Sequence, residues 1–182
     1  MNAPIANGRA GPVNWDRWTV IVLKPDCVER DLVTPVLGRV AASVTVVATE
    51  RVTVADWQIF VHYSDLMILR HRFAVDGVDV AQCLRDLYIG HEVVVALAYG
   101  PDDVTAWRVR QLLGDFDPSQ AEPGTIRADF GTDSLPTARA QHRLVNNLIH
   151  TSDDPVAARR DFDTWFGRDC KHLLCIPEEK RA

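Results

Sequence analysis

Three segments of the chain are rich in β-branched and other apolar residues and are bounded by charged or turn-forming residues. Runs of this length and composition are typical of buried β-strands. They predict strands over Trp18–Leu23, 45–54 and Glu92–Tyr99. The first run is followed directly by Lys24, Pro25 and Asp26, which predict that this strand ends in a turn.

Between these runs, apolar residues recur at the three- and four-residue spacing of amphipathic helices. Pro35 falls in the first turn of one such segment, where a missing N–H group is tolerated. Gly77 interrupts the pattern, and Gly114 ends a helix that residues 100–103 cap. The predicted helices cover 32–44, 55–71, 78–88, a segment that ends at Leu113, 139–149 and 154–166.

Strands and helices alternate along the chain, which predicts an α/β or α+β class with one central sheet. The length of 182 residues suggests a single domain. We expect a flexible tail over 1–14, a folded domain over 15–167 and an extension over 168–182. Residues 115–138 hold most of the loop signals, and a loop of this length inside a compact domain is usually functional.

The composition excludes several classes of function. Hydrophobic residues make up 47% of the chain and charged residues 25%, as in ordinary globular proteins. The net charge of −5 argues against general nucleic-acid binding, which needs a basic face. The four cysteines are scattered, so neither a zinc site nor a disulfide framework is expected. Without a signal-peptide pattern or a membrane-length apolar run, the expectation is a cytoplasmic protein with no membrane partner.

The segment 146–155 places His150 directly before a cluster of hydroxyl and carboxylate groups, Thr151 to Asp154. A histidine held in one tautomer by such neighbours keeps one ring nitrogen free as a nucleophile or base. The alternative is a surface histidine beside an ordinary helix cap. Taken alone, the segment favours this second interpretation, so further residues are needed to change it.

Three cations stand at positions where an anionic ligand would be met. Lys24 follows the first predicted strand, at the mouth of the sheet, and Arg110 lies in the last turn of its helix. Arg127 closes a segment that opens with Pro123 and Gly124; glycine lets the backbone approach a ligand, and arginine suits bidentate phosphate contact. Taken alone, Lys24 is better explained as a structural or solvated charge, and Arg110 equally well as a favourable helix-dipole contact.

Together, these residues form four short motifs that occur in one order: Lys24-Pro25-Asp26, Arg110-Gln-Leu-Leu-Gly114, Pro123-Gly-Thr-Ile-Arg127-x-Asp129-Phe130 and Asn147-x-x-His150-x-Ser152-Asp153. This set resembles the nucleoside diphosphate kinase family, from about Trp18 to Phe166. The last two motifs are the specific ones, and their occurrence in order makes chance similarity a poor explanation.

The resemblance implies a ferredoxin-like α+β fold, in which a central antiparallel βαββαβ sheet is covered by helices. It also implies transfer of the terminal phosphate of a nucleoside triphosphate such as ATP to a nucleoside diphosphate, by a ping-pong mechanism through phosphorylated His150. Magnesium would bridge the nucleotide phosphates with few direct protein ligands. Members of the family usually form tetramers or hexamers, so a homo-oligomer is expected.

By the same resemblance, the side chains that contact the phosphates and the nucleotide are Lys24, Arg110, Arg127, Asn147 and, for base stacking, Phe73. Tyr63 matches a tyrosine near the transferred phosphate, and Ser152 matches a serine beside the histidine. Asp161 falls where the family has a glutamate that orients the histidine ring. For Tyr63 the alternative is a packed aromatic residue, and for Asp161 a surface helix carboxylate.

The chain departs from the family pattern at four positions. Thr151 stands where glycine usually follows the histidine, and its Cβ is expected to restrict the backbone and crowd the nucleophile. Asp161 is one methylene shorter than the usual glutamate, Phe116 replaces a phosphate-contacting threonine, and Asn146 replaces an arginine. Two stretches are longer than usual, 63–93 and 130–147. The departures leave two alternatives open: a related phosphotransferase that acts on a modified nucleotide, and a non-catalytic nucleotide-binding module.

Overall fold

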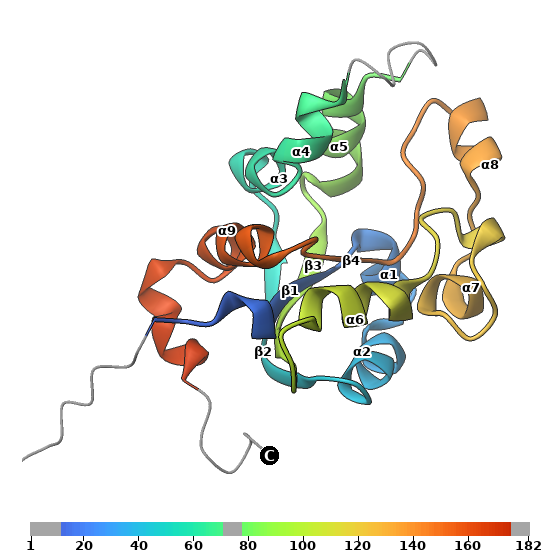
Figure 1. The fold of residues 1–182 in the computed structure, drawn as a ribbon. Coiled ribbons are helices and arrows are strands. Elements are labelled where there is room, and N and C mark those ends of the chain that lie inside the picture. The colour runs from blue at the N-terminus through green and yellow to red at the C-terminus, as the bar shows by residue number, and fades with distance from the viewer. Residues whose placement is uncertain (1–11, 71–77, 176–182) are drawn as a thin grey trace, which may run out of the picture.

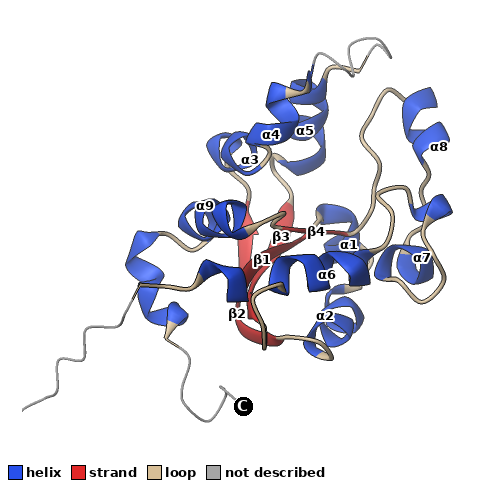
Figure 2. Cartoon of the chain, in the orientation of Figure 1, coloured by secondary structure: helices blue, strands red, loops and turns tan. Residues whose placement is uncertain are grey.

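The computed structural model describes residues 12–70 and 78–175 (Figure 1). Its centre is a four-stranded antiparallel sheet in the order β2-β3-β1-β4 (Figure 2). The strands are β1 Trp18–Leu23, β2 Thr45–Thr53, β3 Glu92–Tyr99 and β4 Ile149–Thr151. The sequence therefore located the three long strands to within one residue, and the α+β class with a ferredoxin-like sheet order is confirmed.

Helices connect and cover these strands. In the described residues they are α1 Pro25–Glu29, α2 Val33–Ala41, α3 Asp56–His62, α4 Ser64–Ile68, α5 Val80–Tyr88, α6 Thr105–Leu113, α7 Ile126–Phe130, α8 Leu135–Ala140 and α9 Pro155–Trp165. Short 3₁₀ segments add Trp15–Arg17, Pro118–Gln120 and Arg168–Leu174. No helix within the two described ranges is long and apolar enough to cross a membrane.

The sheet lies between two layers of helices because successive side chains of a strand point to opposite faces. Val20 and Val22 of β1 pack in a core with α3, α5 and α9. Ile21 and Leu23 pack in a second core with α2 and α6. All six residues of β1 are buried, as expected for a central strand that is covered on both faces. Figure 1 shows α3 and α9 on one side of the sheet and α2 and α6 on the other.

Two of the helix predictions need correction. The helix predicted over 139–149 is wrong, since α8 ends at Ala140 and the chain reaches β4 through an irregular segment. Leu148 in this segment has a φ of 68°, which no right-handed helix accommodates. The helix predicted over 55–71 is divided at Tyr63 into α3 and α4.

Two loop predictions also differ from the structure. The turn predicted at Lys24-Pro25-Asp26 opens α1, with Pro25 at its first position, where proline is well tolerated. The loop predicted over 115–138 contains a 3₁₀ segment, α7 and the start of α8. After α9, the residues Cys170, Leu173 and Leu174 pack against the core formed with α3, α5 and α9.

Candidate active site

The direction of the His150 side chain follows from the register of β4 on β1. His150 pairs with Val22, while Ile149 and Thr151 pair with Leu23 and Ile21. Since paired residues of a sheet share a face, His150 points into the layer of α3 and α9. Its ring lies 5.3 Å from the ring of Tyr63, measured between centroids. The predicted nucleophile therefore sits on a strand, fixed by the sheet, rather than at a helix start.

Thr151 points to the other face of the sheet and does not crowd His150. Its side chain is fully buried, and its Oγ1 lies 2.8 Å from Oγ1 of Thr19, a hydrogen bond in which either hydroxyl can donate. Thr151 also has ordinary strand geometry, because the positive φ values of non-glycine residues in the described ranges occur elsewhere. The expectation that its Cβ would restrict the nucleophile is therefore wrong: strand alternation turns that Cβ away.

This hydrogen bond predicts a stability change without a change in activity. Thr151→Val leaves the buried Thr19 hydroxyl unpaired and is expected to lower the free energy of unfolding by about 1–3 kcal/mol. The double variant Thr19→Val/Thr151→Val removes both polar groups and is expected to recover most of that loss. Urea unfolding of the wild type, Thr19→Val, Thr151→Val and the double variant measures the cycle. Additive losses, or a matching loss of phosphate transfer in Thr151→Val, would contradict this account of Thr151.

Lys24 and Asn147 form a buried pair beside the histidine strand. Nζ of Lys24 donates to Oδ1 of Asn147 over 2.6 Å, and Nδ2 of Asn147 donates to the carbonyl oxygen of Phe116 over 2.7 Å. Burial lowers the pKa of Lys24 to about 8, opposed by the carboxylate of Asp26 and assisted by the charge of Arg127. An anion that arrived here would find a desolvated ammonium group to which no carboxylate of the described residues is hydrogen-bonded.

The lowered pKa of Lys24 predicts how stability depends on pH. Between about pH 8 and pH 10.5 the unfolded chain holds this proton and the folded chain releases it. Stability therefore rises with pH in that window, and below it both states are protonated and the contribution is flat. Urea unfolding of the wild type and a Lys24→Met variant isolates the effect. The difference in unfolding free energy, wild type minus variant, should rise across the window; a fall would contradict the burial argument.

Arg127 and Arg110 reach the same region in different ways. The buried guanidinium of Arg127 donates to three backbone carbonyl oxygens, those of Gly114, Asn147 and Ile149, at 2.7 to 3.3 Å. It therefore fixes the backbone on both sides of Leu148 and, through its own burial, has its pKa lowered to about 10. Arg110 forms an ion pair with Asp153, three residues after His150, and both side chains are about half exposed.

The surroundings of His150 keep its imidazole neutral. The pKa of its ring is held well below the ordinary value, first by burial and then by the neighbouring His62, Lys24, Arg110 and Arg127. A neutral imidazole has an unshared pair on one nitrogen, which a nucleophile requires. Burial also raises the pKa of Tyr63, so this phenol stays protonated, and it lies 2.5 Å from the hydroxyl of Tyr88.

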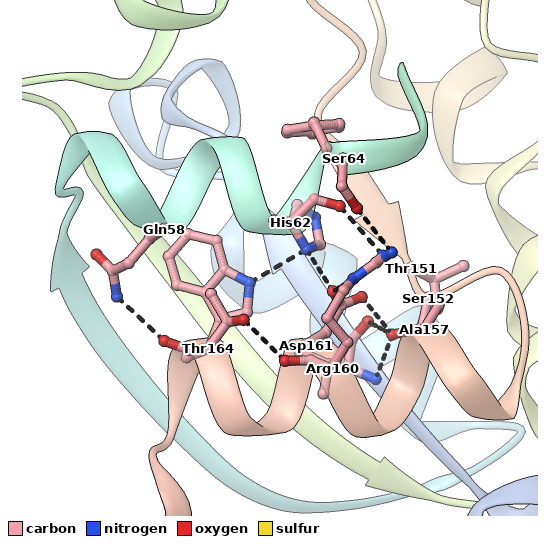
Figure 3. Close-up of polar contacts among 12 residues, drawn as sticks. Gln58, His62, Ser64, Thr151, Ser152, Ala157, Arg160, Asp161 and Thr164 are labelled. Carbon is pink, nitrogen blue, oxygen red and sulfur yellow. Dashed lines mark hydrogen bonds and ion pairs between the residues drawn. The ribbon is translucent and has the colours of Figure 1, made fainter. Parts of the chain in front are cut away.

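Asp161 and Ser152 belong to a buried cluster that joins α9 to α3 and to the residue after β4 (Figure 3). Both side chains are fully buried, and Oγ of Ser152 donates to Oδ2 of Asp161 over 2.8 Å. Oδ1 of Asp161 lies 3.0 Å from Nδ1 of His62 and 3.2 Å from Nε of Arg160. Among the described residues, none of these contacts goes to His150. Asp161 is thus neither a surface carboxylate nor a direct partner of the His150 ring.

The sequence did not single out His62, Arg160 or Trp165, although all three complete this cluster. Nη1 of Arg160 donates to Oγ of Ser64 and its Nη2 to the carbonyl oxygen of His62, which ties α9 to α3 and α4. Nε1 of Trp165 lies 3.3 Å from Nδ1 of His62. The available signal was the position of His62, directly before the tyrosine that the motif comparison selected.

Two remaining expectations concern the base and the metal. Phe73 lies outside the described residues, while Phe116 is 54% exposed at the rim of the site. No group of three or more His, Cys, Asp or Glu side chains that could hold a metal ion occurs in residues 12–70 and 78–175. The exposed carboxylate nearest in sequence to His150 is that of Asp153. A single carboxylate is what a magnesium ion needs when most of its oxygen ligands come from a bound nucleotide and water.

Comparisons with known proteins give one consistent answer. A model of the family described as nucleoside diphosphate kinase matches residues 17–170. A nucleoside diphosphate kinase of Mycobacterium sp. (strain MCS) is 36% identical over 150 residues, which are 81% of this chain and 95% of that protein. One from Streptococcus pneumoniae (strain Hungary19A-6) is 31% identical over 150 residues, 81% of this chain and 98% of that protein.

Solved structures agree with the sequence relatives. The nucleoside-diphosphate kinase of Borrelia burgdorferi, a transition-state mimic with bound vanadate and ADP, matches with a TM-score of 0.74 and 27% identity, over 87% of this chain and 98% of that chain. An NDP kinase of Pyrobaculum aerophilum matches with a TM-score of 0.70 and 28% identity, over 90% and 97%.

Proposed function

Because the chain belongs to the nucleoside diphosphate kinase family, we propose that His150 is the side chain that carries phosphate between two nucleotides. The chain is an enzyme that transfers the terminal phosphate of a nucleoside triphosphate to a nucleoside diphosphate. The observation that supports His150 most directly is its neutral, half-buried ring on a strand, surrounded by Lys24, Arg110 and Arg127.

The reaction proceeds in two balanced half-reactions. The unshared pair of one His150 nitrogen attacks the terminal phosphorus, the N–P bond forms, and the bond from phosphorus to the bridging oxygen breaks. The nucleoside diphosphate leaves with that electron pair. In the second half-reaction a terminal phosphate oxygen of the acceptor attacks the phosphorus of the phosphohistidine. A P–O bond forms, the N–P bond breaks, and its electron pair returns to His150. Both halves demand mainly positioning and charge neutralisation from the protein.

The neighbouring side chains supply those two needs. Lys24 places a desolvated ammonium beside the histidine strand, held in position by Asn147. Arg127 uses three of its five N–H donors on backbone carbonyls, which leaves two for phosphate oxygens. Arg110 exchanges Asp153 for the incoming phosphates, and the protonated Tyr63 donates its hydroxyl to the transferred group. Ser152 and Asp161 contribute indirectly, because the hydrogen bond between them fixes β4 against α9.

Magnesium fits this set of side chains as an ion carried by the nucleotide. Within residues 12–70 and 78–175 the interior of the site offers cations and amides and no cluster of metal-binding side chains, so the ion's oxygen ligands would come from phosphates and water. Asp153 would hold the water shell on the protein side once Arg110 turns to the phosphates. When bound, the ion neutralises the phosphate charges that repel an approaching nucleophile.

We also propose the domain bounds, the assembly and the compartment of the enzyme. The catalytic unit is taken as residues 15–167, assembled as a tetramer or hexamer of identical chains. Trp57 and Trp107 support such an assembly, because each is more than half exposed on its helix. The free thiols of all four cysteines support a reducing compartment, the cytoplasm.

A panel of acceptors tests the proposed function. The phosphorylated enzyme, prepared with ATP and magnesium, is mixed with each common nucleoside diphosphate, and the loss of protein-bound phosphate is followed. Comparable, fast transfer to all of them is the expected result, with the parallel double-reciprocal plots of a ping-pong reaction. A stable phosphoenzyme that none of them discharges would favour a modified nucleotide as acceptor. ATP binding without phosphoenzyme would favour a non-catalytic module.

A further inference from the structure

His62 is a buried histidine whose contacts the phosphate-transfer scheme does not use. It is the last residue of α3 and is 2% exposed. Its Nδ1 faces Asp161, but its Nε2 is buried and has no hydrogen-bond partner among the described residues. The rings of His62 and His150 are neighbours, with centroids 4.8 Å apart and planes at 81°. A buried nitrogen without a partner is costly and needs an explanation.

The contacts of Asp161 determine which nitrogen of His62 carries the proton. Its two oxygens face the Ser152 hydroxyl at 2.8 Å and the Arg160 guanidinium at 3.2 Å, both donors, so the carboxylate is ionised. An ionised oxygen 3.0 Å from Nδ1 of His62 requires a proton on that nitrogen. The indole N–H of Trp165 also donates to this nitrogen over 3.3 Å, an arrangement that needs Nδ1 bare, but the contact with the Asp161 carboxylate is shorter and charge-assisted and therefore decides the tautomer. Nε2 of His62 therefore carries an unshared pair.

We propose that His62 is a positioning residue for His150: Asp161 fixes the proton on Nδ1 of His62, and the bare Nε2 accepts the ring N–H of His150. This inference rests on the proposed role of His150 as the nucleophile. A turn of His150 about χ2, a broad torsion, brings its N–H to Nε2 from the present edge-on arrangement. The remaining nitrogen of His150 is then bare and aimed at phosphate.

The same contact assists the transfer step. As the N–P bond forms and the bridging P–O bond breaks, the His150 ring gains positive charge. Its N–H proton stays on the ring and is shared with Nε2 of His62, and Asp161 balances the partial positive charge that this sharing places on the His62 ring. Asp161 is one methylene shorter than the glutamate usual in the family, and the imidazole of His62 makes up the difference in length. The carboxylate contacts His62, and His62 in turn lies against His150.

A matched pair of amide variants separates positioning from simple anchoring. In His62→Asn the side-chain N–H₂ takes the place of Nδ1 and keeps the hydrogen bond to Asp161. This variant has no acceptor in the place of Nε2 to face His150. In His62→Gln the amide oxygen takes the place of Nε2 and faces His150, while the hydrogen bond to Asp161 is lost. We expect His62→Asn to slow phosphoenzyme formation by about 10–100-fold and His62→Gln to stay within about threefold of wild type, since orienting partners carry effects of this size. Thermal melts and binding of a non-hydrolysable ATP analogue check that each variant is folded.

A role in anchoring alone predicts the opposite order, with His62→Asn the more active variant. That order, equal losses in the two variants, or wild-type rates in both would overturn the inference while leaving His150 as the nucleophile. Absence of phosphoenzyme in the wild type would overturn both proposals. Independently of any variant, ¹⁵N NMR of the wild type should show His62 protonated at Nδ1 and bare at Nε2. A proton on Nε2 of His62 would contradict the proposed contact, in which this nitrogen accepts the N–H of His150.

Discussion

Replacement of His150 by alanine is expected to abolish phosphate transfer, with a loss on the order of 10⁴-fold or more. The reason is chemical: the neighbouring nitrogens cannot take the place of the His150 ring, because Nζ of Lys24 donates to Asn147 and the bare Nε2 of His62 is buried. Steady-state conversion of ATP and a second nucleoside diphosphate, followed by chromatography, measures the loss. A loss of less than tenfold would show that another group receives the phosphate.

The matched control for this variant is His91→Ala. His91 is a second histidine of the chain, 45% exposed at the side chain and paired with Glu29 rather than with any residue of the site. It should transfer phosphate at the wild-type rate. His150→Ala should also unfold within about 1 kcal/mol of the wild type, because it removes a half-buried ring without leaving a buried charge.

Asp161→Ala is expected to lower the free energy of unfolding by about 3–5 kcal/mol, the cost of leaving buried ionic partners uncompensated. Asp161 is fully buried and receives Ser152, His62 and Arg160, so its removal disconnects β4 from α9 and α3. Urea denaturation gives the value. We also expect slower phosphoenzyme formation at temperatures where the variant remains folded, since both the strand and His62 lose their anchor.

Asp163→Ala is the control for this second variant. Asp163 lies on the same helix two residues later, is partly exposed, and pairs with the largely exposed Arg168 over 3.5 Å. Exposed pairs of this kind contribute little, so the change should stay within about 0.5 kcal/mol. If Asp161→Ala were no more destabilising than Asp163→Ala, the buried cluster would not hold the site together.

The sequence predicted the parts of the fold that local pattern determines. The strands β1, β2 and β3 are β-branched runs that the sheet buries, and their pattern was sufficient. The strand β4 has only three residues, and the apolar residues before it, Leu144, Val145 and Leu148, fall at helical spacing. There the outcome depends on partners distant in sequence: Asp26 accepts the N–H of Leu148, and Lys24 donates its N–H to the Leu148 carbonyl.

The site was predictable in its members but not in all of its contacts. The motifs selected Lys24, Asn147 and Arg127, and the fold brings them together around the start of β4. They did not indicate that Thr151 faces away from the histidine, because strand parity depends on recognising β4. Nor did they indicate that a shorter carboxylate at 161 would meet a second histidine, which requires the packing of α3 on α9.

Isolation of the phosphorylated protein shows whether His150 carries the phosphate. The wild-type chain is incubated with magnesium and ATP labelled in its terminal phosphate, then separated from nucleotide. We expect one labelled phosphate per chain that is acid-labile, alkali-stable and discharged by a nucleoside diphosphate, and no label on His150→Ala. Equal labelling of His150→Ala, or no label on the wild type, would contradict this role of His150.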